Sequence, residues 1–275
     1  YLIKSISGIF VLRVAGVALG IVSSIVFARL MGPDEYGRYS FAIETMMFIS
    51  IPVALGFPQL LTREVSKYNA NQDYTHLKGL LRWSGLFSSL AAIVFIGLTA
   101  LVVSFAEGDP YKRLLFFIAL PIIALRGIGQ VRMGALRGLK EPIKAQLPDA
   151  VLRPGLTVLL IGLLYFVFKI EINAKIALVA MDATLLISFI IGVVWLYKAL
   201  PDNARSNNRY SYENKYWLKE AVPFFFLGGI AIVNSRLSMV LTGVYLHDAD
   251  VGYYKIALTA STLVSFFLTA VNTTI

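Results

Sequence analysis

Long apolar stretches separated by short polar segments run along the whole chain. Eight of these stretches are about 20 residues long, the length that an α-helix needs to cross the hydrocarbon core of a bilayer. Glycine and proline interrupt several of them, which membrane helices tolerate. The pattern predicts an all-α polytopic membrane protein with spans at residues 6–30, 39–57, 83–105, 114–134, 151–168, 176–197, 221–246 and 251–275.

The polar segments between these spans alternate in positive charge. Basic residues gather after the second, fourth and sixth spans and are fewer after the others. Because basic connections stay in the cytoplasm, we expect a cytoplasmic N-terminus. The basic connections carry Arg63, Lys67, Lys78, Arg82, Arg137, Lys140, Lys144, Lys198, Arg205, Arg209, Lys215 and Lys219. Aromatic residues expected at the two membrane interfaces are Tyr36, Tyr39, Trp83, Tyr111, Tyr197 and Trp217.

The composition supports a lipid-facing exterior. Only 15% of the residues are charged, against about 25% in soluble domains, and mean hydropathy is +0.72. The net charge of +9 would suggest nucleic acid in a soluble protein, but here the basic residues flank apolar spans. We therefore expect membrane lipids as partners and no nucleic acid.

Few residues are available for metal or cofactor chemistry. The absence of cysteine excludes disulfides and thiolate-bound metals, and His76 and His247 are far apart in sequence. We expect neither a metal nor another cofactor. The longest connections, 58–82 and 198–220, are much shorter than the roughly 50 residues of a small domain. Function is therefore expected among the helices, without an enzymatic domain.

A weak internal repeat divides the chain. Each matching pair is separated by 215 positions, by subtraction of the residue numbers, and the same offset aligns the first two spans with the last two. Such a parallel repeat predicts two six-helix lobes with a substrate site between them. Residues 1–215 would form the first lobe and 216–275 would begin the second, so we expect more helices beyond this sequence. The residues Gly37, Tyr39, Ala42 and Ser50 recur as Gly252, Tyr254, Ala257 and Ser265.

The turn between the first two spans carries a recognisable motif. Residues 29–39 read Arg-Leu-Met-Gly-Pro-Asp-Glu-Tyr-Gly-Arg-Tyr. This resembles the first-loop signature of the polysaccharide-export flippases, Arg-Leu-Leu-Gly-Pro-x-x-Tyr-Gly-x-Tyr, with Met31 as a volume-conserving replacement. These flippases belong to the multidrug/oligosaccharidyl-lipid/polysaccharide exporter superfamily. The signature residues are Arg29, Gly32, Pro33, Tyr36, Gly37 and Tyr39, and we expect them to shape a hairpin.

The resemblance implies a fold of twelve or fourteen helices, of which this chain would cover the first eight. It also implies a flippase of the inner membrane for polysaccharide biosynthesis. The substrate would be an undecaprenyl-pyrophosphate-linked oligosaccharide, moved by alternating access. Expected partners are this lipid-linked oligosaccharide and, in the same pathway, glycosyltransferases and a polysaccharide polymerase.

Ionisable residues inside the spans are costly, and each is a functional candidate. A cationic cytoplasmic half would attract a lipid pyrophosphate. The arginines predicted there are Arg13, Arg126, Arg132 and Arg153, whereas Glu44, Asp182, Asn234 and Arg236 are predicted on the outer side. Two of these arginines could instead have structural roles: Arg153 could pair with Asp149, and the Arg132 side chain could reach the membrane interface. Candidates for substrate binding are Arg13, Arg126, Gln130, Asn234 and Arg236, and candidates for ion coupling are Glu44 and Asp182.

Two other functions remain open at this point. A cation-coupled drug antiporter of the same superfamily would share the fold, although arginines inside the membrane repel cationic drugs. A membrane-embedded polysaccharide ligase or polymerase would need catalytic groups in a large outer loop, and the predicted outer loops are short.

Overall fold

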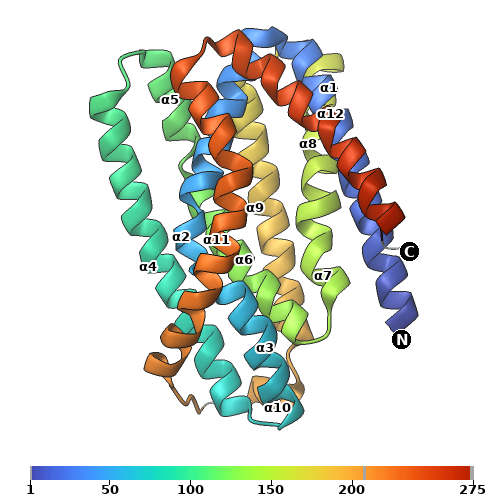
Figure 1. The fold of residues 1–275 in the computed structure, drawn as a ribbon, viewed down its shortest axis with the longest axis vertical. Helices are drawn as coiled ribbons and strands as arrows, with labels where there is room; N and C mark the ends of the chain where they lie inside the picture. The colour runs from blue at the N-terminus through green and yellow to red at the C-terminus, as the bar shows by residue number, and fades with distance from the viewer. Residues whose placement is uncertain (1, 207–208, 273–275) are drawn as a thin grey trace.

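The computed structural model describes the backbone of residues 2–206 and 209–272. It describes the side chains of residues 8–205 and 209–262, apart from 231, 232, 234 and 235. Every regular element in these ranges is a helix, which confirms the all-α prediction. The longer helices form an upright bundle (Figure 1).

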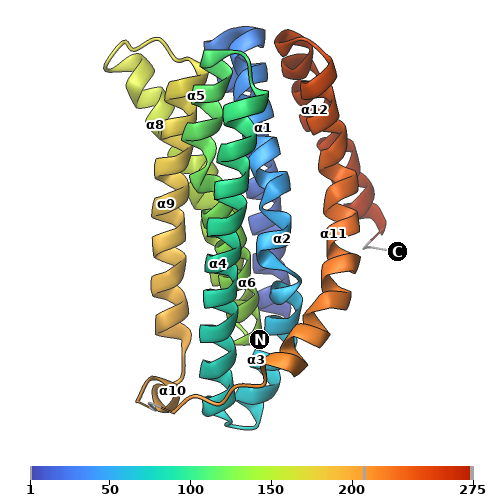
Figure 2. The same cartoon turned by 90° about the vertical axis from the view of Figure 1, so that its left-hand side faces the viewer.

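The helices follow one another through short connections. Their bounds are α1 Leu2–Ile49, α2 Ile51–Ala54, α3 Phe57–Ala70, α4 Tyr74–Ala106, α5 Pro110–Ala119, α6 Pro121–Gly138, α7 Pro142–Leu147, a π-helix η1 at Pro148–Leu152, α8 Arg153–Phe166, α9 Ala174–Ala199, α10 Asp202–Ser206, α11 Asn214–Tyr245 and α12 Asp248–Asn272. The Gly32 end of the bundle is the end that holds Gly32 and the connections 106–110, 166–174 and 245–248. The α10 end is the opposite one, with α10 and the connections 70–74 and 138–142 (Figures 1 and 2).

The predicted hairpin after the first span is present as a sharp bend in α1. Gly32 has φ 76° and ψ 171°, a left-handed backbone conformation that glycine adopts without steric cost. Across the bend, the Ser24 Oγ and Tyr36 Oη atoms are 2.7 Å apart. A straight helix would separate residues twelve positions apart by about 18 Å. We call residues 8–31 the first arm of α1 and residues 33–49 the second arm.

Five helical stretches in the described residues are long and apolar enough to cross a membrane. Large apolar side chains such as Leu90 and Ile93 of α4 are exposed on their outer faces, as lipid contact requires. The first stretch includes both arms of α1. The five are Gly8–Ala54, Tyr74–Ala106, Pro110–Gly138, Pro142–Phe166 and Ala174–Ala199.

The helix ends differ from the predicted span ends for local reasons. The predicted span 114–134 is divided between α5 and α6, because Pro121 begins a new helix. Helix α4 begins nine residues before the predicted Trp83, at Tyr74, where the Asp73 side chain caps it by accepting a hydrogen bond from the His76 N–H.

Several aromatic residues expected at the interfaces are buried instead. Tyr36, Tyr39 and Trp217 are 2%, 7% and 0% exposed. The Trp217 Nε1 donates to the Tyr68 hydroxyl at 3.1 Å, so its polar atom is satisfied within the protein. A span-end position therefore did not place these side chains at the membrane surface, because neighbouring helices cover them.

The two repeat segments come into close backbone contact at the Gly32 end. A Cβ atom on Gly37 would overlap the carbonyl of Asp248, and one on Gly252 would overlap the carbonyl of Pro33. Both Pro33 and Asp248, and Gly37 and Gly252, are pairs at the 215-residue offset. Contacts that are reciprocal in this way are what a two-fold relation between the segments produces. The lobe boundary near residue 215 stays a prediction.

Candidate functional site

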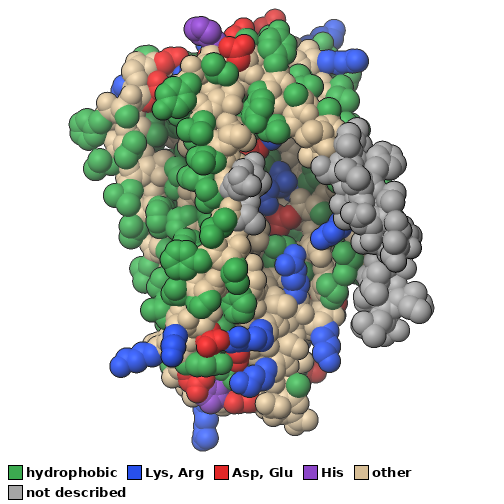
Figure 3. Space-filling view, viewed as in Figure 1, with side chains coloured by type: hydrophobic (Ala, Val, Ile, Leu, Met, Phe, Trp, Pro, Cys, Tyr) green, Lys and Arg blue, Asp and Glu red, His purple; other side chains and the backbone are tan. Residues whose placement is uncertain are grey.

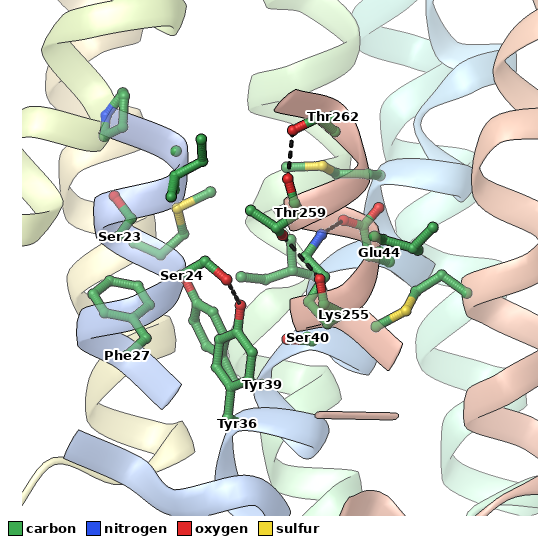
Figure 4. A pocket seen from close by; sticks show the side chains of 18 of the residues that line it. Ser23, Ser24, Phe27, Tyr36, Tyr39, Ser40, Glu44, Lys255, Thr259 and Thr262 are labelled. Atoms are coloured by element: carbon green, nitrogen blue, oxygen red, sulfur yellow. Dashed lines mark hydrogen bonds and ion pairs between the residues drawn. The ribbon is translucent and has the colours of Figure 1, made fainter. Parts of the chain in front are cut away.

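A cavity of about 570 Å³ lies among the two arms of α1 and helices α6, α8, α9, α11 and α12. In the space-filling view it appears as a hollow with charged side chains inside (Figure 3). Many lining residues carry hydroxyl groups (Figure 4). These are Ser23, Ser24, Tyr36, Tyr39, Ser40, Thr157, Thr259, Ser261 and Thr262.

The charged residues that line this cavity are mostly cationic. They are Arg126, Arg153, Arg236, Lys255 and the single carboxylate Glu44, so four positive charges oppose one negative charge and the sum is +3. The surrounding helices are apolar, and a wall of low dielectric constant strengthens the field of these charges. The cavity is therefore suited to an anionic ligand.

A second cavity, of about 280 Å³, lies among α2, α3, α6 and α11, nearer the α10 end. Arg126 and Arg236 line both cavities, so these guanidinium groups stand between the two spaces. Gln130 and Arg137 also line the second cavity. Two of the predicted substrate-binding residues thus lie at the boundary between the cavities. Gln130, a third, lies one helical turn from Arg126 toward the α10 end.

The only carboxylate lining the larger cavity, among the residues described, is held between two cations. We call this cluster the Glu44 junction. Glu44 belongs to the second arm of α1, and its two oxygens accept hydrogen bonds from Arg236 of α11 and Lys255 of α12. Its side chain is 11% exposed. These partners lie 192 and 211 positions away, so no local pattern in the sequence reveals them.

The alternative of a local pair between Arg153 and the Asp149 carboxylate is wrong. That carboxylate instead pairs with Arg126 at 3.3 Å and Arg132 at 3.0 Å. Arg153 donates instead to the backbone oxygen of Asp149 at 3.5 Å and to the Met181 Sδ at 3.4 Å. The π-helix over Pro148–Leu152 explains the difference, since its wider turn rotates residue 153 away from the face expected four residues after 149. Arg132 is 4% exposed and does not reach the interface.

Two arginines of the cavity keep unused hydrogen-bonding capacity. The buried Nε atoms of Arg126 and Arg153 have no hydrogen-bond partner among the described residues. Buried donors without partners are costly and are usually satisfied by water or a ligand. They add to the case for an anion in this space.

The remaining candidates lie elsewhere. Arg13 is exposed on the first arm of α1 and is not among the residues lining either cavity. Asp182 lies on α9 outside both cavities, and its buried Oδ1 has no hydrogen-bond partner within the described part of the chain. The side chain of Asn234 lies outside the described residues.

A second cluster of the same kind, at the Gly32 end, was not predicted. Asp248, at the start of α12, accepts from the Arg38 Nε at 2.8 Å and forms a 2.7 Å ion pair with the Lys112 Nζ. We call these three residues the Asp248 junction. Burial alone would raise the pKa of Asp248, but the hydrogen bonds from Lys112 and Arg38 hold it below its ordinary value. The sequence signal was the alignment of Asp248 with the signature residue Pro33.

Glu35 extends this junction toward α5 and α9. Its Oε1 pairs with Arg38 at 2.9 Å. Its Oε2 accepts from the Tyr111 hydroxyl and from the backbone N–H of Ala174, both at 2.8 Å. The second arm of α1 is thereby joined to α5, α9 and α12 at this end of the bundle.

At the α10 end, three side chains have the atom order of a hydrolase triad. The Ser211 Oγ lies 2.8 Å from the His76 Nε2, and the His76 Nδ1 lies 2.6 Å from the Asp73 Oδ2. The Ser211 backbone N–H is already used, since it donates to the Thr75 carbonyl. Asp73 is also the cap of α4. The cluster therefore fastens the segment before α11 to the start of α4.

The comparisons with known proteins agree with the signature turn. The family model described as polysaccharide biosynthesis protein matches residues 2–275, which include both arms of α1, both cavities and both junctions. No curated protein and no solved structure gave a significant match.

Proposed function

Because the chain belongs to the polysaccharide biosynthesis protein family, we propose that it is a flippase that moves a lipid-pyrophosphate-linked oligosaccharide across the inner membrane. Transport would occur by alternating access, without enzymatic chemistry or a cofactor. The single observation that supports this most is the cavity with a charge sum of +3 inside an apolar helical bundle.

The lining residues suit the two polar parts of such a substrate. Guanidinium groups bind phosphate oxygens through paired hydrogen bonds, which favours Arg126, Arg153 and Arg236 as the pyrophosphate site. The hydroxyl groups offer both donors and acceptors for sugars. The lipid tail would remain in the hydrocarbon core of the bilayer, so that moving it across requires no change of solvent.

The proposal includes a topology. We propose eight membrane crossings in this sequence, with the first six in one lobe and α11 and α12 beginning the next. The α10 end would face the cytoplasm because its connections are the more basic ones. The N-terminus would then be cytoplasmic, and the Gly32 end would face outward.

The test is transport of a fluorescent pyrophosphate-linked glycolipid in vesicles that contain the purified protein. Arg126→Ala should lower the transport rate by at least about 30-fold, because it removes one member of the buried charged pair that we propose between Arg126 and the pyrophosphate. Truncating such a pair costs about 2 kcal/mol or more. Lys144→Ala is the matched control, since Lys144 pairs on the surface with Glu141 and should be silent.

Unchanged transport by a folded Arg126→Ala protein would contradict the proposed role of the cavity. Wild-type vesicles that move a cationic dye and leave the glycolipid in place would contradict the substrate class.

A further inference from the structure

We infer that Glu44 is a built-in competitor for the anionic group of the substrate. In this structure the Glu44 carboxylate occupies the place between Arg236 and Lys255 that a phosphate takes when substrate binds. This inference rests on the proposed function and assigns one residue a part in it: Glu44 sets how tightly the anion is held and how readily it leaves.

The donors around Glu44 suit a phosphate as well as a carboxylate. Arg236 and Lys255 come from different helices, α11 and α12, and converge on the two oxygens of one carboxylate. Carboxylates and phosphates accept hydrogen bonds from the same guanidinium and ammonium groups. All three residues line the larger cavity, so a phosphate that enters it meets donors already brought together.

The internal repeat does not preserve the charges of Glu44 and Lys255. By subtraction of 215, the position equivalent to Glu44 holds Thr259, and the position equivalent to Lys255 holds Ser40. At each of these two pairs of equivalent positions, one hairpin carries a charged residue and the other carries a hydroxyl residue, where the hairpins are the two arms of α1 and the pair α11 and α12. A carboxylate is not needed at this position for the hairpins to pack. All four side chains lie together at the cavity (Figure 4).

Glu44 also supplies the one negative charge among the described residues that line the larger cavity. Without Glu44 the lining would carry four positive charges and no negative one. Neighbouring cations repel each other most strongly in an apolar environment, so an empty cavity needs an internal anion. A substrate phosphate replaces that anion, and the return of Glu44 to Arg236 and Lys255 helps to expel the substrate.

The experiment measures binding of geranylgeranyl pyrophosphate, with geranylgeraniol as the uncharged probe, to the full chain in nanodiscs. Glu44→Gln should bind the pyrophosphate at least about tenfold more tightly than wild type, because a nearby competing charge is removed. Its affinity for geranylgeraniol should not change. In the vesicle assay the same variant should turn over more slowly, because release loses its competitor.

Glu64→Gln is the matched control. Glu64 is also a buried carboxylate between two cations, Arg63 and Lys67, but it lines neither cavity. It should leave pyrophosphate affinity unchanged. Lys255→Gln provides an independent variant, because it removes a donor and should weaken pyrophosphate binding several-fold.

Equal or weaker pyrophosphate binding by folded Glu44→Gln would overturn the inference. If that variant does not fold, unchanged binding by Lys255→Gln would overturn it equally. The proposed function can fail independently of this inference. Tighter pyrophosphate binding by Glu44→Gln, together with a wild type that moves no glycolipid, would support the phosphate site and contradict the flippase function. Glycolipid transport by wild type, together with an unaltered affinity of Glu44→Gln for the pyrophosphate, would support the flippase function and contradict the role of Glu44 as competitor.

Discussion

The Asp248 junction and the Glu44 junction place the same charges in two different settings. Each has one carboxylate between two cations, and each joins the second arm of α1 to α12. The carboxylates are similarly covered, with side chains 14% exposed for Asp248 and 11% for Glu44. Burial and charge count therefore do not distinguish the two junctions.

What distinguishes them is the backbone around each one. Beside Asp248, Gly37 and Gly252 bring two helices into backbone contact. Beside Glu44, the helices separate around a cavity of about 570 Å³. The Asp248 junction therefore holds the second arm of α1 against α12 at the Gly32 end, whereas the Glu44 junction borders the cavity in which we propose that its partners exchange.

The largest expected effect comes from breaking the backbone contact at the Asp248 junction. Gly37→Leu should lower the free energy of unfolding by about 3 kcal/mol or more, because its side chain has to displace the Asp248 carbonyl. The measurement is thermal or denaturant unfolding in detergent. Gly97→Leu is the control, since a Cβ at Gly97 meets nothing within 4 Å. Equal effects of the two substitutions would show that the close contact is not needed.

A smaller effect is expected from removing the charge of the same junction. Asp248→Asn should cost about 1–2 kcal/mol of unfolding free energy, because Arg38 and Lys112 then face each other without a shared anion. Asp250→Asn is the control, since Asp250 accepts only the His247 N–H within the described interactions. A larger loss of unfolding free energy in Asp250→Asn than in Asp248→Asn would contradict the stabilising role of the Asp248 junction.

Acid should remove the same contribution without mutation. The pKa of Asp248 is lowered in the folded protein, so its stabilisation is present above its ordinary value of about 3.9 and is lost as pH falls below that value. The difference in melting temperature between wild type and Asp248→Asn should therefore be largest near neutral pH and should shrink toward pH 3. A constant difference over this range would contradict the ion pair.

The smallest effect is expected from Lys112→Ala. Lys112 is about one quarter exposed, and Arg38 still binds Asp248 when it is removed. The loss of unfolding free energy should be about 0.5 kcal/mol and should decrease with added salt. A loss as large as that of Asp248→Asn would mean that Lys112, and not Arg38, carries the junction.

Hydropathy and local motifs predicted the framework of this protein. The bend at Gly32 and Pro33 follows from the conformations open to those two residue types, and the signature turn predicted the family. Residues on one helix face were also predictable, since Gln130 joins Arg126 at the second cavity.

The partners of the buried charges were not predictable, because they come from other helices. The Asp149 carboxylate binds Arg126 and Arg132, and a π-helix that no local motif announced turns Arg153 away. Arg13 is exposed. This was not predictable, because the sequence of an apolar helix does not reveal which of its sides meets neighbouring helices. The Glu44 junction depends on helix packing between residues about 200 positions apart.

The cationic character of the larger cavity can be tested directly, because the sequence contains no cysteine. A single cysteine at Thr259, which lines the cavity, would be treated with anionic and cationic thiosulfonate reagents of equal size. A cysteine at the exposed Gly108 would give the reference ratio of the two rates. We predict that the anionic reagent is favoured at Thr259→Cys by at least about tenfold over that reference. Preference for the cationic reagent, or no reaction with either, would contradict the account.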